Sequence, residues 1–194
     1  MNSNKDGNYL IDRHKHIQFE AWMMNETLLL LTDSSFGKKR SGSDRERVEW
    51  QATLDSYIAH CRCLVEFFTM DKRHFENDVW LGKFDLNWKI ETRFGDFYTN
   101  SSQRLVHLTE SRFEGNIDWL KKYSKITPVL NKHLIEFCDK VCATYNNEEA
   151  KRLYEDLKKE LTTYSEKANS QLHNFNGVVT STGKADTSSY IRKL

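Results

Sequence analysis

The 194-residue sequence contains few residues that break helices, with one proline and eight glycines in all. So few breakers favour long helices over a β architecture with many turns. Long apolar runs are lacking too, since none approaches the roughly 18 to 20 residues that cross a membrane. The opening residues, MNSNKDGNY, lack the apolar core of a signal peptide. We therefore expect a cytoplasmic protein with no membrane segment.

An excess of one charge and a metal-binding cysteine pattern are also missing. The 29 basic and 28 acidic residues nearly cancel, so the total charge does not indicate a nucleic-acid binder, although it leaves room for a local basic patch. The spacing of Cys61, Cys63, Cys138 and Cys142 does not match a zinc site. We expect reduced thiols in the core, and neither a metal nor a cofactor.

Several catalytic motifs are absent as well. The chain has no glycine-rich phosphate loop of the form GxxxxGK[ST] or GxGxxG, no HExxH and no GxSxG. Its acidic residues form no ExxH pair of the kind found in di-iron bundles. A nucleotide-binding accessory domain therefore ranks behind the two functions considered below.

The sequence does contain apolar residues that recur every three or four positions. This periodicity predicts a helix over residues 9–31 and, after a loop, a second helix over about 44–69. Ser43 or Asp44 is the predicted N-cap of the second helix, with Glu46 near the capping-box position. The predicted core stripes are Leu10, Ile17, Ala21, Met24, Leu28 and Leu31 in the first helix, and Trp50, Leu54, Tyr57, Ile58, Cys61, Leu64, Val65 and Phe68 in the second.

The second half of the chain is predicted to be helical after an irregular insertion. Residues 70–97 are rich in aromatic residues and aspartate without a period, which indicates short helical turns and a packed loop. A helix capped by Thr99, Asn100 or Ser101 and ending at about Thr109 or a little beyond precedes two more, over about 116–145 and 146–172. Proline is tolerated in the first turn of a helix. The single proline therefore predicts that a second helical segment begins close to it, within residues 116–145.

Together these elements predict one all-α domain. We expect an antiparallel bundle of about five or six helices, because short connections make neighbouring helices antiparallel. The bundle is predicted to comprise residues 1–174 and to carry the aromatic-rich insertion, with a loose tail over 175–194.

The stretch RLVHLTESR carries candidate catalytic residues. On a helix, Arg104 and His107 share a face, and Arg112 lies a little further round. Arginine neutralises phosphate, and histidine, with an unperturbed pKa near 6.5, exchanges a proton at neutral pH. RNA cleavage needs little more than such a group and a cation, without a metal. The alternative is that these side chains hold helices of the bundle together.

The stretch DSYIAHCRCLVEFF is interrupted in a similar way by His60 and Arg62. His60 lies at the edge of the predicted core stripe, where it either assists the same site or is an ordinary core-edge histidine. Arg62 and Glu66 are four residues apart, which predicts a helix-surface ion pair. The sequence leaves open whether the two stretches are halves of one polar site.

A basic segment, GKKRSGSDRER, is the candidate nucleic-acid contact. Its cations Lys38, Lys39, Arg40 and Arg45 lie just before a predicted helix or in its first turn, where they would meet phosphates. The alternative is an ordinary solvated loop.

The two stretches around His60 and His107 resemble motifs of a group of small, mostly uncharacterised bacterial helical proteins. LDSYIAHCRCLVEFF is similar to their long-helix motif, His-x-Arg before an apolar-Phe-Phe end, and LVHLTESR is similar to a partner motif, His-Leu-Thr followed by Arg. The architecture of that group resembles the HEPN superfamily of helical bundles, which includes metal-independent ribonucleases of toxin and antiviral defence systems. The resemblance covers roughly residues 48–119.

The chain departs from the HEPN pattern in one respect. Active HEPN nucleases carry an arginine, four to six further residues and then a histidine, and no arginine of this chain has a histidine at that distance. The resemblance implies a homodimer with its sites at the interface, and the departure is compatible with either a rearranged site or a non-catalytic relative.

We therefore predict an RNA-acting protein, in its most specific form a metal-independent endoribonuclease of a toxin or antiviral defence system. In this hypothesis His107 is the general acid–base, Arg104 and Arg112 bind phosphate, and His60 assists. The alternative is a non-catalytic adaptor or regulatory bundle that binds a protein partner. The first hypothesis requires these side chains to converge on an open cleft, whereas the second leaves them apart, or buried and paired.

Overall fold

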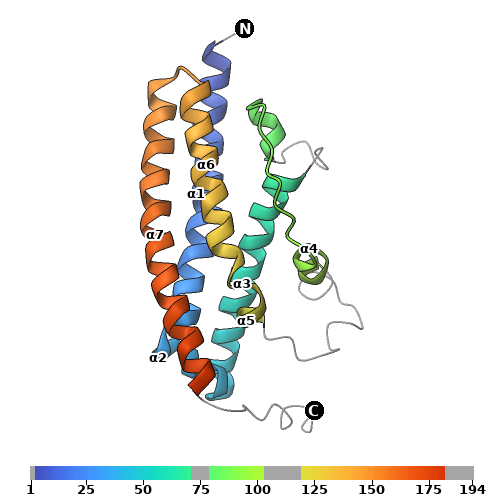
Figure 1. Ribbon diagram of the computed structural model, residues 1–194, viewed down its shortest axis with the longest axis vertical. Coiled ribbons are helices and arrows are strands. Elements are labelled where there is room, and N and C mark those ends of the chain that lie inside the picture. Colours follow the sequence, from blue (N-terminus) through green and yellow to red (C-terminus); the bar gives the residue numbers. More distant parts are fainter. Residues whose placement is uncertain (1–2, 71–78, 103–118, 182–194) are drawn as a thin grey trace.

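The computed structural model describes residues 3–70, 79–102 and 119–181, and these form a bundle of four long helices (Figure 1). No strand occurs in these ranges, so the predicted all-α bundle is confirmed. None of the helices described combines the length and apolarity needed to cross a bilayer. The long helices are α1 (Ser3–Thr32), α3 (Asp44–Thr69), α6 (Ile126–Thr144) and α7 (Glu148–Ser181), and the short ones are α2 (Ser34–Gly37), α4 (Phe97–Ser101), α5 (Trp119–Tyr123) and the 3-10 turns η1 (Lys38–Ser41) and η2 (Leu81–Phe84).

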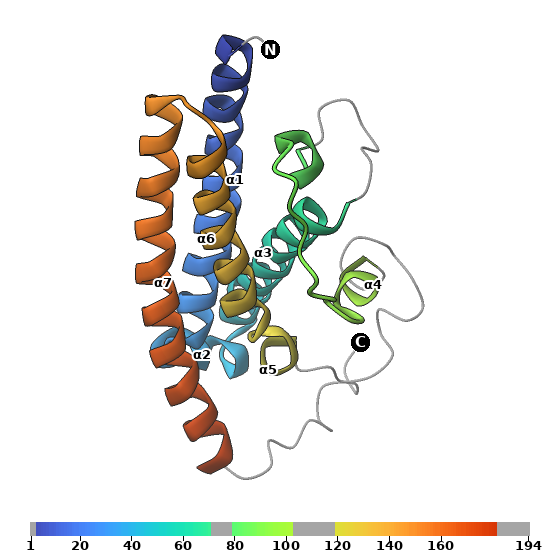
Figure 2. The same cartoon turned by 45° about the horizontal axis from the view of Figure 1, so that its top comes forward.

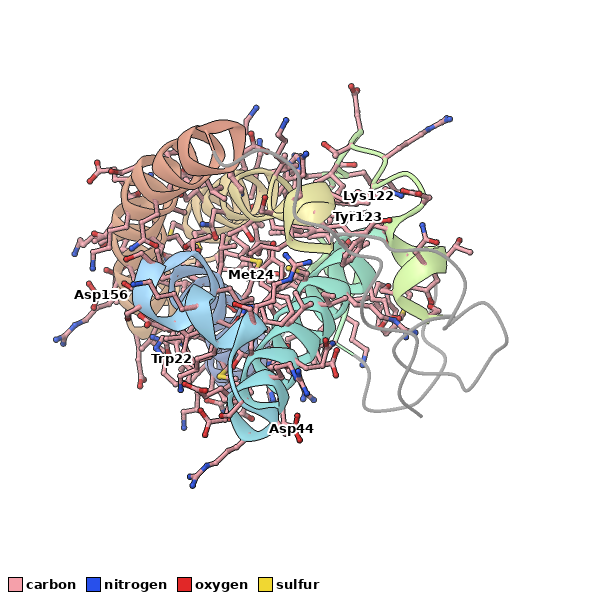
Figure 3. All side chains as sticks on the ribbon, turned by 90° about the horizontal axis from the view of Figure 1, so that it is seen from below. Trp22, Met24, Asp44, Lys122, Tyr123 and Asp156 are labelled. Carbon is pink, nitrogen blue, oxygen red and sulfur yellow. The ribbon has the colours of Figure 1, made fainter. Side chains whose placement is uncertain are left out.

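The four long helices form a square in which α1 packs mainly on α3 and α7, and α6 packs mainly on α7. Helices α1 and α6 are therefore diagonal to each other, as the view along the bundle shows (Figure 3). Helices α1 and α3 run antiparallel, as do α6 and α7, whereas α1 and α7 run in the same direction (Figure 1). Because α1 packs mainly on two of the other helices, its inner side lies in the core and its opposite side faces outward.

The start of α3 follows the sequence-based prediction. Ser43 is the N-cap, and its side chain accepts a hydrogen bond from the backbone N–H of Glu46. The Glu46 carboxylate in turn accepts from the backbone N–H of Ser43 at 2.8 Å, which completes a capping box. Every residue of the two core stripes predicted for α1 and α3 is buried.

The end of α7 differs from the prediction. We expected the bundle to end at position 174, but α7 continues to Ser181. Asparagine and glycine after that position suggested a break, yet each costs only about 1 kcal/mol or less inside a helix, and a long helix that is already formed can absorb that cost. Residues 182–194 of the predicted tail lie outside the described residues.

The aromatic insertion is packed and irregular, as predicted, over its described part, residues 79–96. It runs along the side of the bundle formed by α3 and α6 (Figure 2). Phe84 is fully buried, and its ring contacts Phe137 of α6 edge-on at 4.9 Å. His133 of α6 lies 2.7 Å from the hydroxyl of Thr92. These contacts make the insertion a part of the core.

His14 connects α1 to α7 and makes the stability of the bundle depend on pH. The buried imidazole donates from Nε2 to the carbonyl oxygen of Leu153 at 2.9 Å. Burial lowers the pKa of His14, and the hydrogen bond to Leu153 opposes this effect. Between the lowered pKa and the unfolded value near 6.5, the unfolded chain binds more protons than the folded chain.

We therefore expect the free energy of unfolding to fall as the pH decreases through about 6.5, with the contribution of neutral His14 complete above that pH. Urea unfolding between pH 7.5 and 5.5 measures the slope. His14→Gln keeps an N–H donor for Leu153 and should flatten the slope, and His16→Gln is the control on the exposed side of α1. A slope unchanged by His14→Gln would contradict this assignment.

Candidate functional site

Three of the four predicted catalytic residues, Arg104, His107 and Arg112, lie outside the described residues. Their predicted roles in phosphate binding and proton transfer therefore stay predictions. The fourth, His60, is described, as are the four cations predicted to contact nucleic acid.

His60 lies on the side of α3 that faces α1. Its Nδ1 is 2.7 Å from Oε2 of Glu20, and its side chain is 16% exposed. The edge of its ring meets Phe19 of α1, with the two ring centres 5.7 Å apart. His60 is thus paired with a carboxylate and covered by an aromatic ring, and both contacts connect α3 to α1.

Arg62 extends from the other side of α3. Its Nη2 pairs with Oε1 of Glu66 at 3.0 Å, which confirms the predicted ion pair. Its guanidinium lies over the ring of Tyr98 in α4, 5.2 Å from the ring centre. Residues two positions apart on an α-helix point in directions that differ by about 200° around its axis. His60 and Arg62 are therefore held by different neighbours, α1 and α4, and form no joint site.

The predicted basic patch lies where η1 meets the start of α3. Glu49 accepts from Lys39 at 2.5 Å and from Arg45 at 3.2 Å, and these partners hold the pKa of Glu49 below its usual range. Arg40 lies over the ring of Trp50 at 5.1 Å, while Lys38 is exposed. The patch therefore exists, but neighbouring side chains already engage three of its four cations.

The cysteines differ in their surroundings. Cys61 and Cys138 are buried as expected, and burial raises the pKa of the Cys61 thiol to about 12, which keeps it protonated. Cys63 is exposed, contrary to the expectation of a core residue, because it lies on the outward side of α3. Among the described residues, no three His, Cys, Asp or Glu side chains are grouped so that they could hold a metal ion.

The most unusual surface in the described residues is the outward side of α1, which the sequence analysis did not single out. Phe19 is 51% exposed, Trp22 42% and Leu30 43%. Trp22 points away from the bundle, whereas Met24 lies between the helices (Figure 3). We call this surface the outer face of α1; it consists of the exposed residues Lys15, Phe19, Trp22, Glu26 and Leu30, with the half-buried Ile11, which also packs on the core, at its edge.

A signal for this face was present in the sequence. The segment FEAWMMNETLLLL has apolar residues on every side of a helix, not on one stripe alone. A helix that is apolar all round is normally covered on all sides. The inner stripe forms the core, and the remaining apolar residues of this segment lie outside it.

No family model, no curated protein and no solved structure matches the chain. The HEPN resemblance therefore stays a prediction.

Proposed function

We propose that the chain is a non-catalytic helical binding protein that contacts a protein partner through the outer face of α1. The observation that carries this proposal is the exposure of Phe19, Trp22 and Leu30 on one side of a helix whose other side forms the core. Single exposed apolar residues are ordinary, but two exposed aromatic rings in contact, with an exposed leucine further along the same face, are typical of an interaction surface.

The two aromatic residues of this face are held in place before any partner arrives. The Phe19 ring contacts Trp22 at 6.2 Å and His60 at 5.7 Å between ring centres. Glu20 fixes the His60 imidazole through the 2.7 Å contact. Aromatic residues dominate binding energies at interfaces, and side chains that are already ordered lose less entropy on binding. In this proposal His60 positions an aromatic contact residue.

The arrangement of the candidate polar residues also supports a binding role. His60, the one described member of the predicted catalytic set, is paired with Glu20, and Arg62 is paired on a different side of α3. Lys39 and Arg45 both pair with the carboxylate of Glu49, which leaves less positive charge available to bind a phosphate. The alternative, an RNA-acting protein with His107 as acid–base, stays a prediction.

Site-specific photocrosslinking in cells that express the chain tests the proposal. A benzophenone amino acid replaces Trp22 on the outer face of α1, and in a second protein it replaces Tyr98 of α4, which is equally exposed at 43%. We expect a discrete crosslinked protein species from position 22 and none from position 98.

Two results would contradict the proposal. One is the absence of any crosslinked species at position 22. The other is cleavage of a mixed RNA pool by the purified chain in the presence of EDTA, abolished in His107→Ala with the fold retained by circular dichroism. That second result would establish the ribonuclease hypothesis instead.

A further inference from the structure

We infer that the partner of the outer face of α1 is a second copy of this chain, docked antiparallel about a two-fold axis. This inference rests on the proposed function, because it names the partner of the same surface.

The outer face of α1 has the same spacing when read in either direction. Its members, residues 11, 15, 19, 22, 26 and 30, are separated by four, four, three, four and four positions. At 100° per residue all six fall within an arc of about 100°. Read forward, the chemistry is apolar, cationic, aromatic, aromatic, anionic and apolar.

This order makes the face complementary to itself when two copies meet in opposite directions. With the two-fold axis between Phe19 and Trp22, each Phe19 faces the partner's Trp22. Lys15 then faces the partner's Glu26, and Ile11 faces the partner's Leu30. Each of these six positions thus meets its own chemical kind or its opposite charge, as a closed, isologous interface requires. Asp12, which is exposed and falls at the edge of the same arc, faces the partner's Leu29. A parallel pair would instead place Lys15 against the partner's Lys15.

The two charged residues of the face have no ion-pair partner in the part of the chain that the structure describes. Among the described residues, Lys15 and Glu26 form no salt bridge, and they are about 16 Å apart along the helix axis, too far to pair with each other. Glu26 accepts a hydrogen bond from the hydroxyl of Tyr164 at 2.6 Å, which fixes its position and leaves the second carboxylate oxygen for another donor. The antiparallel partner supplies that donor.

The neighbouring side of α3 leaves room for the approach of a second bundle. Ser56, Ala59 and Cys63 lie along its outward surface next to the His60–Phe19 contact, and all three have small side chains. Ala59 and Cys63 are exposed. Small side chains on α3 beside the exposed rings of α1 present little bulk to a facing helix.

Sedimentation equilibrium of the full chain tests the inference. One helix face per copy buries an area at or below the small end of stable interfaces, so we expect half-dimerisation on the order of tens of micromolar. The dimer should weaken as the salt concentration rises, because its ion pairs lie at an exposed interface.

Charge reversal separates this geometry from other modes of association. Lys15→Glu places like charges opposite Glu26 of the partner subunit, and Glu26→Lys does the same with opposite sign. Each variant alone should dimerise about tenfold more weakly. An equimolar mixture of the two variants restores both ion pairs and should return to the wild-type affinity, as should the double variant K15E/E26K. The control Glu166→Lys makes the same charge change on the exposed side of α7 and should have no effect.

A wild-type chain that stays monomeric at about 200 µM, well above the expected midpoint, would overturn the inference. So would a mixture of the two variants that associates no better than either alone. The proposed function is judged separately by its crosslinked species. A species with twice the chain mass agrees with both proposals, whereas a species of another mass retains the binding function and rejects self-docking.

Discussion

Phe137→Ala is expected to lower the free energy of unfolding by about 3 to 5 kcal/mol, the largest effect of any single change considered for this protein. Phe137 is fully buried in α6. Its ring makes edge-on contacts with Phe67 of α3 at 5.2 Å, with Phe84 of the insertion at 4.9 Å and with Tyr154 of α7 at 5.6 Å. Truncation to alanine leaves a cavity where four segments of the chain meet.

Guanidinium unfolding followed by circular dichroism measures this loss. Phe137→Leu refills most of the volume and should cost about half as much or less. Phe19→Ala removes the same ring from the outer face of α1, where half of the side chain is already in water, and should cost about 1 kcal/mol or less. A loss below about 1 kcal/mol for Phe137→Ala would mean that the insertion does not depend on this ring.

The helices could be predicted because their information is local. The stripes in α1 and α3 repeat every three or four residues, and all their members are buried. The capping box at Ser43 and Glu46 is a contact between residues three apart, so it can be read without any knowledge of the fold. The single proline lies in the first turn of α6, as its chemistry predicts.

The partners of His60 and Arg62 could not be predicted, since they depend on which helices are neighbours. Glu20 is 40 positions before His60, and nothing in the spacing indicates their contact. Arg62 has one local partner, Glu66, which its spacing predicts, but the ring of Tyr98 comes from a different helix. A histidine at the edge of an apolar stripe gives the same pattern whether it is catalytic or structural.

The outer face of α1 was missed for a different reason. Its signal is local, but core assignment looks for one stripe per helix and treats the remaining apolar residues as background. Phe19, Trp22 and Leu30 become significant only once the opposite side of the helix is known to be filled by Met24 and its neighbours. Apolar residues that remain exposed when the opposite side of their helix already fills the core indicate a surface that binds a partner.

Asn25→Leu is expected to destabilise the bundle by about 1 to 3 kcal/mol because it leaves a buried amide without its partner. Asn25 of α1 and Asn131 of α6 are both buried and exchange two hydrogen bonds, at 3.0 and 2.8 Å. They connect the two diagonal helices across the centre of the core. Asn25 also donates to the backbone oxygen of Ala21 at 2.8 Å, so its replacement removes more than one bond.

The double variant N25L/N131L decides what the pair contributes. Leucine has the same branched shape and number of non-hydrogen atoms as asparagine, and two apolar groups in contact leave no polar atom unpaired. We expect the double variant to be more stable than the sum of the single losses predicts, with a coupling of about 1 to 3 kcal/mol from denaturant unfolding of all four proteins. Additive losses would show that the two amides are not coupled. A third outcome is a double variant as stable as the wild type but with a broadened unfolding transition. It would show that the amide pair contributes little net stability and instead selects one register between α1 and α6, because a purely apolar centre allows more than one alignment of the two helices.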